Sequence, residues 1–354
     1  MPRTSRRAVS AGILVLTTLS SLAFGQADLT LKDVLKRNIL ASGGAEKLAQ
    51  VTGLSFRTGG TRTVVSAAGE LKAVSGRGPV MTEAILVRDG KVRRNSFGTV
   101  TEVTGPQQVI HETLAGLYAG VFSLLKFEGR LELAGLKTYG PEKLYDLTMT
   151  SGGLKVDFFV RAEDFFLKRL LFQGRTPEGD AYEVNTDFAP FEDEQGYLMP
   201  LSWFSSQVGT RGNLAEVTEV EFNPPLDKDF FKSIEVNIGK TEAAPGELKG
   251  NVLDFNASRF GLMITTNWTK KDFERAAFRP LDKLVFHVEG LEAELDYYSE
   301  SAEIPGPDVL SKGARFLGPA PRGGATYVIQ FIAVDTAPLV AKLKPLAPIS
   351  VKKK

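Results

Sequence analysis

The sequence predicts a mostly antiparallel β protein, in which a helix crosses the concave face of one curved sheet and a smaller α+β unit follows. Three observations lead to this prediction: alternating strands over residues 143–231, an apolar helix over 106–125 inside the β run, and a change of pattern after residue 250. Successive strand residues point to opposite faces, so alternation gives each strand one apolar face and one wet face. The apolar face of such a sheet needs a partner, and the helix can supply it.

The N-terminus has the pattern of a secretory signal. Three arginines within the first seven residues precede an apolar stretch over 8–24, and Ala23-Phe24-Gly25 places small residues where a signal peptidase cleaves. We therefore expect a signal peptide over residues 1–25 and a periplasmic or secreted mature protein after cleavage near Gly25. The chain has no cysteine, so we expect neither a lipid anchor on cysteine nor disulfides.

An amphipathic helix is expected first in the mature chain, over residues 29–41. Thr30 and Asp33 fit a capping box, and Gly43-Gly44 ends the helix. Alternating strands then follow, and Asp89-Gly90 marks a hairpin turn between the last two. The expected strands are 54–57, 62–65, 71–74, 80–87 and 92–95.

The helix predicted over residues 106–125 interrupts this β pattern. Pro106 suits the first helical turn. The apolar side chains recur at helical spacing and form a stripe wider than one contact face needs. They are Ile110, Leu114, Leu117, Tyr118, Val121 and Leu125. We therefore expect this helix to pack across the concave face of the sheet as a lid.

Strands resume near residue 131 and continue to 222, where Pro224-Pro225 ends the sheet. The sequence then predicts a linker, because Ala243-Ala244-Pro245-Gly246 has the composition of one. The predicted division is a first domain over 26–238, a linker over 239–250 and a C-terminal α+β domain over 251–354, whose role the pattern does not give. In that last domain the expected strands are 252–256, 284–288, 293–298 and 326–334, and the expected helices are 270–277 and 338–343.

Several short motifs in the right order resemble the outer-membrane lipoprotein-sorting (LolA-like) family over roughly residues 28–231. The motifs are Gly43-Gly44 with Lys47-Leu48, Val156-Asp157-Phe158-Phe159-Val160 with Glu163-Asp164, Gly196-Tyr197-Leu198-Met199-Pro200, and Leu226-Asp227-Lys228-Asp229-Phe230-Phe231. The resemblance implies an open half-barrel of antiparallel strands, closed on its concave side by helices. It also implies that acyl chains of lipoproteins, or other lipids, are held in the space between.

The predicted ligand-binding site is the hydrophobic lining of this concavity. The same side chains would equally suit a filled core, so both alternatives stay open at this point. The lining candidates are Phe56, Leu114, Leu117, Tyr118, Val121, Tyr145, Met149, Phe158, Phe172, Tyr182 and Trp203. Arg88 and Arg94 are candidates to hold a head group at the rim.

The predicted function is therefore a non-enzymatic, exported binding protein whose partners are lipid or lipoprotein acyl chains. The alternative is an envelope interaction or sensor protein with a filled core, which binds an envelope protein through its C-terminal domain. Nucleic acid is not an expected partner, because 43 basic residues face 42 acidic ones without a basic stripe.

Catalytic and cofactor sites are not expected either. Two scattered histidines without cysteine do not make a transition-metal site, and His111 is expected at the polar edge of the lid helix. Asp157 and Glu183 resemble a glycosidase pair by residue type, but both alternate with apolar residues, which favours solvent-exposed positions.

Overall fold

The computed structural model describes residues 29–354 apart from 78–79, 177, 259–260, 280–281, 289–290, 299–312, 320–326 and 333–342. The predicted signal peptide and the predicted helix 338–343, except its last residue, lie outside the described residues. In the rest, the predicted class is confirmed: the chain is mostly antiparallel β and contains a large, curved sheet that does not close.

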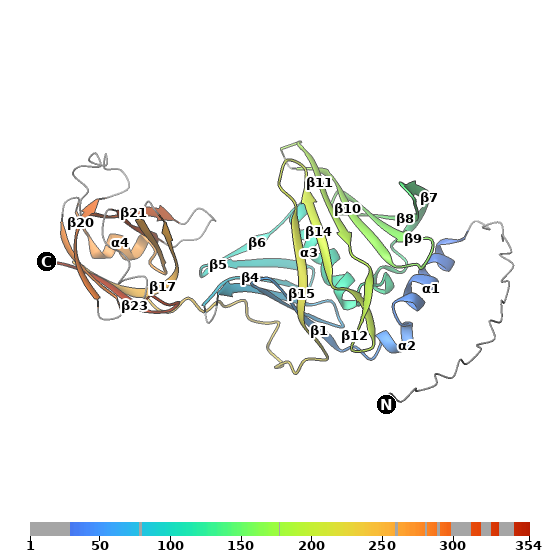
Figure 1. The fold of residues 1–354 in the computed structure, drawn as a ribbon, viewed down its shortest axis with the longest axis horizontal. Helices are drawn as coiled ribbons and strands as arrows, with labels where there is room; N and C mark the ends of the chain where they lie inside the picture. The colour runs from blue at the N-terminus through green and yellow to red at the C-terminus, as the bar shows by residue number, and fades with distance from the viewer. Residues whose placement is uncertain are drawn as a thin grey trace, which may run out of the picture.

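Two consecutive meanders make up this large sheet of thirteen strands (Figure 1). The first runs β1 (Gly53–Thr58), β2 (Thr61–Ser66), β3 (Leu71–Arg77), β4 (Val80–Arg88), β5 (Lys91–Ser96) and β6 (Thr99–Val103). The second runs β7 (Glu132–Tyr139), β8 (Glu142–Ser151), β9 (Leu154–Arg161), β10 (Leu167–Arg175), β11 (Ala181–Phe188), β14 (Ser202–Gln207) and β15 (Asn213–Phe222), with the separate hairpin β12 (Phe191–Glu194) and β13 (Tyr197–Pro200) between β11 and β14.

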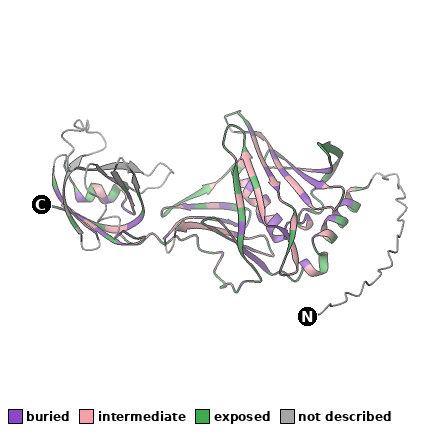
Figure 2. Cartoon of the chain, in the orientation of Figure 1, coloured by how far each residue is buried: buried purple, intermediate pink, exposed green. Residues whose placement is uncertain are grey.

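The two meanders meet at a single seam between β1 and β15, where Leu54 pairs with Phe222. Arg57 on β1 forms an ion pair across this seam with Glu219, at 2.8 Å between Nε and a carboxylate oxygen. Because the seam is central, β6 and β7 become the two outer edges of the sheet. Figure 2 shows buried, half-buried and exposed residues interspersed along the strands, and β9 is buried at most of its positions.

Helix α3 (Pro106–Ala119) connects β6 to β7, so the chain must cross from one edge of the sheet to the other. It does so on the concave face, where its apolar residues join the same core as the inward strand residues. The predicted packing across the sheet is confirmed, but the helix ends before residue 125. Val121 and Phe122 have φ of 46° and 61°, which is left-handed and stops an α-helix. A short 3₁₀ turn, η1 (Leu125–Phe127), follows.

Helix α1 (Leu31–Ala41) begins at the predicted capping box, in which Thr30 and Asp33 cap each other's backbone. It is followed by α2 (Ala45–Leu48). The fully buried side chain of Asn38 fixes α1 to two other segments. Its Nδ2 donates to the carbonyl of Phe165, and its Oδ1 accepts from the amide of Leu124, both at 2.8 Å. Asn38 therefore ties α1 to the β9–β10 turn and to the turn after α3.

The chain after β15 packs on the opposite, outer face of the first meander. Phe231 and Ile234 form a small core with Val64, Ala84 and Leu86, separate from the core under α3. The segment that resembles the family's closing motif, residues 226–231, thus covers strands β2 to β4 from outside. These strands are consequently packed on both faces.

A second sheet of eight strands follows. Its strands are β16 (Glu242–Ala244), β17 (Glu247–Ser258), β18 (Gly261–Thr266), β19 (Lys283–Val288), β20 (Leu291–Tyr298), β21 (Gly313–Pro319), β22 (Tyr327–Ile332) and β23 (Pro348–Lys353). Helix α4 (Lys270–Ala276) accompanies them. Because β23 pairs with both β17 and β19, the pairings close into a ring.

The stretch expected to be a linker, 239–250, is in large part strand. Ala244 pairs with Glu247, so Pro245-Gly246 is the two-residue turn of the β16–β17 hairpin. Leu248 in the same stretch is fully buried in the core of the small sheet. Proline and glycine serve both linkers and tight turns, so composition did not distinguish them.

Candidate functional site

The predicted lining residues come together as one packed core. All eleven belong to the cluster between α3, the following turn and the concave face of the sheet. Nine of them are buried, while Leu114 and Trp203 are half-buried. Their role as ligand contacts stays a prediction, because in this structure they contact one another.

Aromatic contacts fill the space under α3. The ring of Phe56 lies 5.1 Å from that of Tyr118 and 6.0 Å from that of Trp203, in both cases edge to face. Phe127 in η1 lies 4.9 Å from Phe158 on β9. Edge-to-face pairs at these distances are favourable beyond their area burial. A ligand at this place would have to displace them, so this part of the concave face has the character of the filled-core alternative.

The predicted rim arginines are both neutralised by carboxylates. The Nε atom of Arg88 lies 3.3 Å from Glu70 and 3.1 Å from Asp89. Arg94 lies 2.5 Å from Glu83. A head group at either arginine would have to compete with a carboxylate already in place, so neither is a ready anion site.

Two further sequence expectations concern titratable residues. His111 is half-buried, and burial lowers its pKa, with the nearby Arg94 as the second cause. The expected exposure of Asp157 is wrong: this side chain is 2% exposed and lies 2.8 Å from the Lys155 ammonium on the outer face of the sheet. Glu183 is half-buried and accepts a hydrogen bond from Gln173 at 3.0 Å. Both carboxylates are thus engaged with partners of their own.

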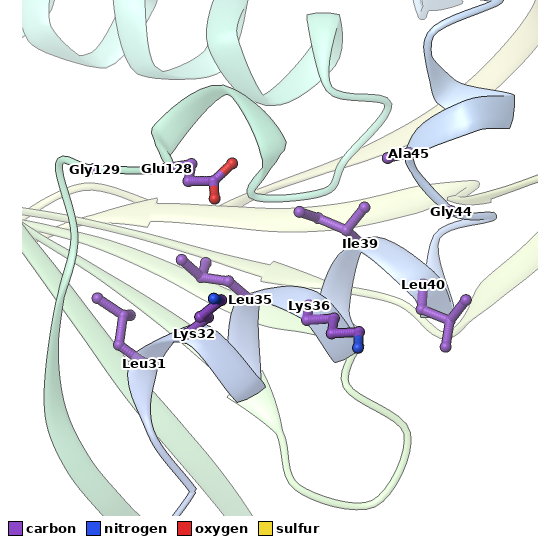
Figure 3. A pocket seen from close by; sticks show the side chains of 10 residues that line it. All are labelled: Leu31, Lys32, Leu35, Lys36, Ile39, Leu40, Gly44, Ala45, Glu128 and Gly129. Carbon is purple, nitrogen blue, oxygen red and sulfur yellow. The ribbon is translucent and has the colours of Figure 1, made fainter.

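An apolar groove lies along α1, at a place that the sequence did not predict as a site (Figure 3). It is bounded by α1, by the start of α2 and by the turn after η1, and its volume is about 640 Å³. Small-molecule sites typically have about 300–1,000 Å³. Its lining residues are Leu31, Lys32, Leu35, Lys36, Ile39, Leu40, Gly44, Ala45, Glu128 and Gly129.

The groove follows from the spacing of residues on α1. Positions four apart lie one above the other on a helix, so Leu31, Leu35 and Ile39 form one apolar row. In Figure 3 these three side chains lie between α1 and the turn that carries Glu128. From Leu31 to Ile39 the row spans eight residue steps, which is about 12 Å at 1.5 Å per residue. The groove is therefore an elongated apolar trough rather than a compact cavity.

A second row, one position further around the helix, forms the outer rim of the groove. It consists of Lys32, Lys36 and Leu40, and the Leu40 side chain is 68% exposed. On the other side, Val34 and Asn38 are fully buried in the core. Helix α1 is thus apolar over more of its circumference than its contact with the sheet uses. The signal in the sequence was Leu40, which lies outside the stripe that packs on the core.

Metal ligands and membrane-spanning helices are not features of the described parts of the chain. No three histidine, aspartate or glutamate side chains there are grouped as metal ligands would be. No helix there has both the length and the apolar character needed to cross a bilayer.

Comparison with known proteins gives similarity at the level of structure. No protein-family model matches the chain, and no curated protein matches it in sequence. A LolA superfamily protein of Nitrosomonas europaea is 15% identical, with a TM-score of 0.36, over 57% of this chain and 97% of that one. A DUF1329 family protein of Desulfovibrio piger is 10% identical, with a TM-score of 0.38, over 58% and 98%. The lipoprotein LppX of Mycobacterium tuberculosis is 13% identical, with a TM-score of 0.23, over 55% and 97%.

Identities and TM-scores this low do not transfer a function to this chain, and its own strands define the fold. The large sheet is antiparallel, curved and open, and its concave face carries a helix that joins opposite edges. This is the open half-barrel with a helical lid that the sequence resemblance implies. The architecture that the sequence resemblance leads us to expect is therefore present in the large sheet with its helices.

Proposed function

We propose that this chain is an exported, non-enzymatic binding protein that holds an acyl chain in the groove along α1. The observation that carries the proposal is the apolar row Leu31, Leu35 and Ile39, which lines a trough of about 640 Å³. Leu35 is buried, and Leu31 and Ile39 are half-buried, so the latter two offer most of the accessible apolar surface of the row. Apolar burial stabilises a complex by roughly 25 cal/mol per Å², so an acyl chain needs no reacting group to bind. An elongated trough suits a linear chain better than a compact ligand.

The proposal includes a division of the chain. A signal peptide over residues 1–25 would send the mature protein to the periplasm or out of the cell. The large sheet with α1 and α3 would be the binding domain. The small sheet, from β16 onwards, would be a second domain, with the boundary near residues 239–241 in place of a longer linker. The apolar core of the small sheet is separate from both cores of the large sheet, which supports this division.

Native mass spectrometry of the purified mature chain tests the binding function, together with titration of a fluorescent fatty acid. Leu31→Gln with Leu40→Gln places polar groups in the groove without opening the core, because neither leucine is fully buried. We expect at least tenfold weaker binding. The matched control is Leu136→Gln with Leu214→Gln, at side chains that are 44% and 59% exposed outside the groove.

The control should bind like the parent chain. A parent protein that carries no lipid and also fails to bind the fluorescent acid would reject the function. Equal binding by parent, groove variant and control would reject the groove as the site.

A second candidate function is supported by the filled core under α3, where Phe56, Tyr118 and Trp203 contact one another. In this alternative the chain takes no lipid and binds an envelope protein through the small sheet. A photo-crosslinking residue at Met263, which is 38% exposed on β18, tests it in the full-length chain. A second variant carries the photo-crosslinking residue in place of Leu40, on the rim of the groove. Specific capture of one envelope protein from position 263, with none from position 40, would favour the alternative. Absence of capture from position 263 would reject the alternative.

A further inference from the structure

We infer that the ligand of the α1 groove is a single acyl chain with an anionic head group, and that Lys32 and Lys36 hold that head group. This inference rests on the proposed function and adds the chemical class of the ligand. It starts from the position of two lysines on the rim of an otherwise apolar trough.

The two lysines are placed to act together. They are four residues apart on α1, so their Cβ atoms are about 6 Å apart on the same side of the helix. A lysine covers apolar surface with its methylene stem and keeps its ammonium group in water. Lys32 and Lys36 can therefore extend the apolar wall of the groove and offer two ammonium groups at its edge. A carboxylate or phosphate between them would accept hydrogen bonds from both.

Other cationic side chains near the groove already interact with groups of the protein, unlike Lys32 and Lys36. Arg37 on the same helix lies 5.1 Å over the ring of Phe165. Lys47 on α2 donates to the carbonyl of Gly196 and lies over the Tyr197 ring. By contrast, neither Lys32 nor Lys36 has a hydrogen bond or an ion pair with any residue that the structure describes. Their ammonium groups thus have no direct partner among the described residues, although Lys36 also acts at longer range on the Asp33 carboxylate, as one of the causes that, after the hydrogen bonds from Thr30, lower its pKa.

Nearby carboxylates set the balance of charge. Asp33 is turned towards the helix start, where it accepts a hydrogen bond from the Thr30 hydroxyl at 2.6 Å. Glu128 lies on the opposite side of the groove from the two lysines. Two lysines against one glutamate leave a net positive charge at the groove. Glu128 opposes an anionic head group, so its removal should strengthen binding, whereas removal of the lysines should weaken it.

The test compares charged and neutral forms of the same chain. The mature full chain is titrated with a fluorescent undecanoic acid, with its methyl ester, and with a lysophosphatidic acid of similar chain length. We expect the acid to bind more tightly than the ester. Lys32→Gln with Lys36→Gln should weaken the anionic probes roughly threefold to tenfold, which is the range of two exposed ion pairs. The ester should change less than twofold.

Two further variants complete the design. Lys91→Gln with Lys143→Gln removes two exposed lysines away from the groove and should leave all three affinities unchanged. Glu128→Gln should tighten the anionic probes roughly twofold to threefold without affecting the ester. A preference for the carboxylate or for the phosphate probe would identify a free fatty acid or a phospholipid as the source of the head group.

The inference would be overturned, and the proposed function left intact, by either of two results. The first is equal affinity of the parent chain for the acid and the ester. The second is an equal decrease of both affinities in the lysine variant. Failure of the ester and both anionic probes to bind would reject the proposed function as well.

Discussion

Replacement of Asn38 by alanine should destabilise the fold by about 2–4 kcal/mol. The Asn38 side chain is fully buried, and both of its hydrogen bonds, to the Phe165 carbonyl and from the Leu124 amide, measure 2.8 Å. Alanine would leave the buried Leu124 amide and the half-buried Phe165 carbonyl without a partner. Each unsatisfied buried group costs roughly 1–3 kcal/mol, and the partial exposure of Phe165 keeps the sum in the lower half of the combined range. Because whole domains are stable by only about 5–15 kcal/mol, this is a large fraction of the total.

Urea unfolding followed by circular dichroism measures this loss, and amide hydrogen exchange locates it. We expect the Leu124 amide to exchange faster in Asn38→Ala, since it loses its acceptor. Asn38→Asp is a second informative variant. The aspartate keeps an acceptor for the Leu124 amide, but it directs an oxygen at the Phe165 carbonyl and buries a charge. It should therefore lower the free energy of unfolding at least as much as Asn38→Ala does. Asn213→Ala, at an exposed position on β15, is the matched control.

A loss below about 0.5 kcal/mol in Asn38→Ala, or unchanged protection of the Leu124 amide, would refute this reasoning. The consequence would be that α1 is held by apolar packing alone. The expected loss has a functional side as well, since α1 also carries the groove. A loosened α1 should bind the fluorescent fatty acid more weakly although Asn38 does not line the groove.

Three other predictions follow from burial and charge. Leu117→Ala should lower the free energy of unfolding by about 2–5 kcal/mol, measured with urea, because Leu117 is a fully buried residue of α3. Leu40→Ala, at a side chain 68% exposed, should be nearly neutral. Lys155→Met should cost about 1–3 kcal/mol because it leaves the buried Asp157 without its ion-pair partner, and Asp157→Asn in addition should recover part of that loss. Burial, with the nearby Arg94 as the second cause, lowers the pKa of His111 below 6.5. The unfolded chain therefore binds more protons than the folded chain, and stability falls as the pH drops below 6.5. In His111→Gln the free energy of unfolding should depend less on pH between about pH 7 and 5.

Local sequence predicted those elements that local chemistry determines. The capping box at Thr30 and Asp33 and the hairpin turn at Asp89-Gly90 need no distant residue, and both occur as expected. The crossing of the sheet by α3 was also predictable, because an apolar helix inside a β run must bury its wide stripe somewhere. The open antiparallel sheet followed from strand alternation and from the motifs that resemble the LolA-like family.

Features that depend on tertiary packing were not predictable in the same way. Helix α3 stops at Ala119 because the chain has to turn towards β7, although its apolar spacing continues to Leu125. Asp157 alternates with apolar residues like a solvent-facing side chain, yet the lysine beside it on β9 covers it.

The groove is a further example. Leu31, Leu35 and Ile39 pack against the core on one side and line the groove on the other. Whether such a row is also left open to a groove depends on the position of the turn after η1, and the sequence of one helix cannot reveal that.

The single seam of the large sheet has a consequence for how the chain folds. Strand β1 pairs with β15, so residues near the two ends of this sheet's sequence must meet before the sheet is continuous. Contacts between such distant residues slow folding. Until β15 has been synthesised and has paired with β1, β1 is an edge strand with unpaired backbone groups, which strands of other chains can join. Arg57 lies on that strand and meets Glu219 only when the seam closes. Before then Arg57 is an unpaired charge on an edge strand, a position at which charged side chains disfavour pairing with other chains.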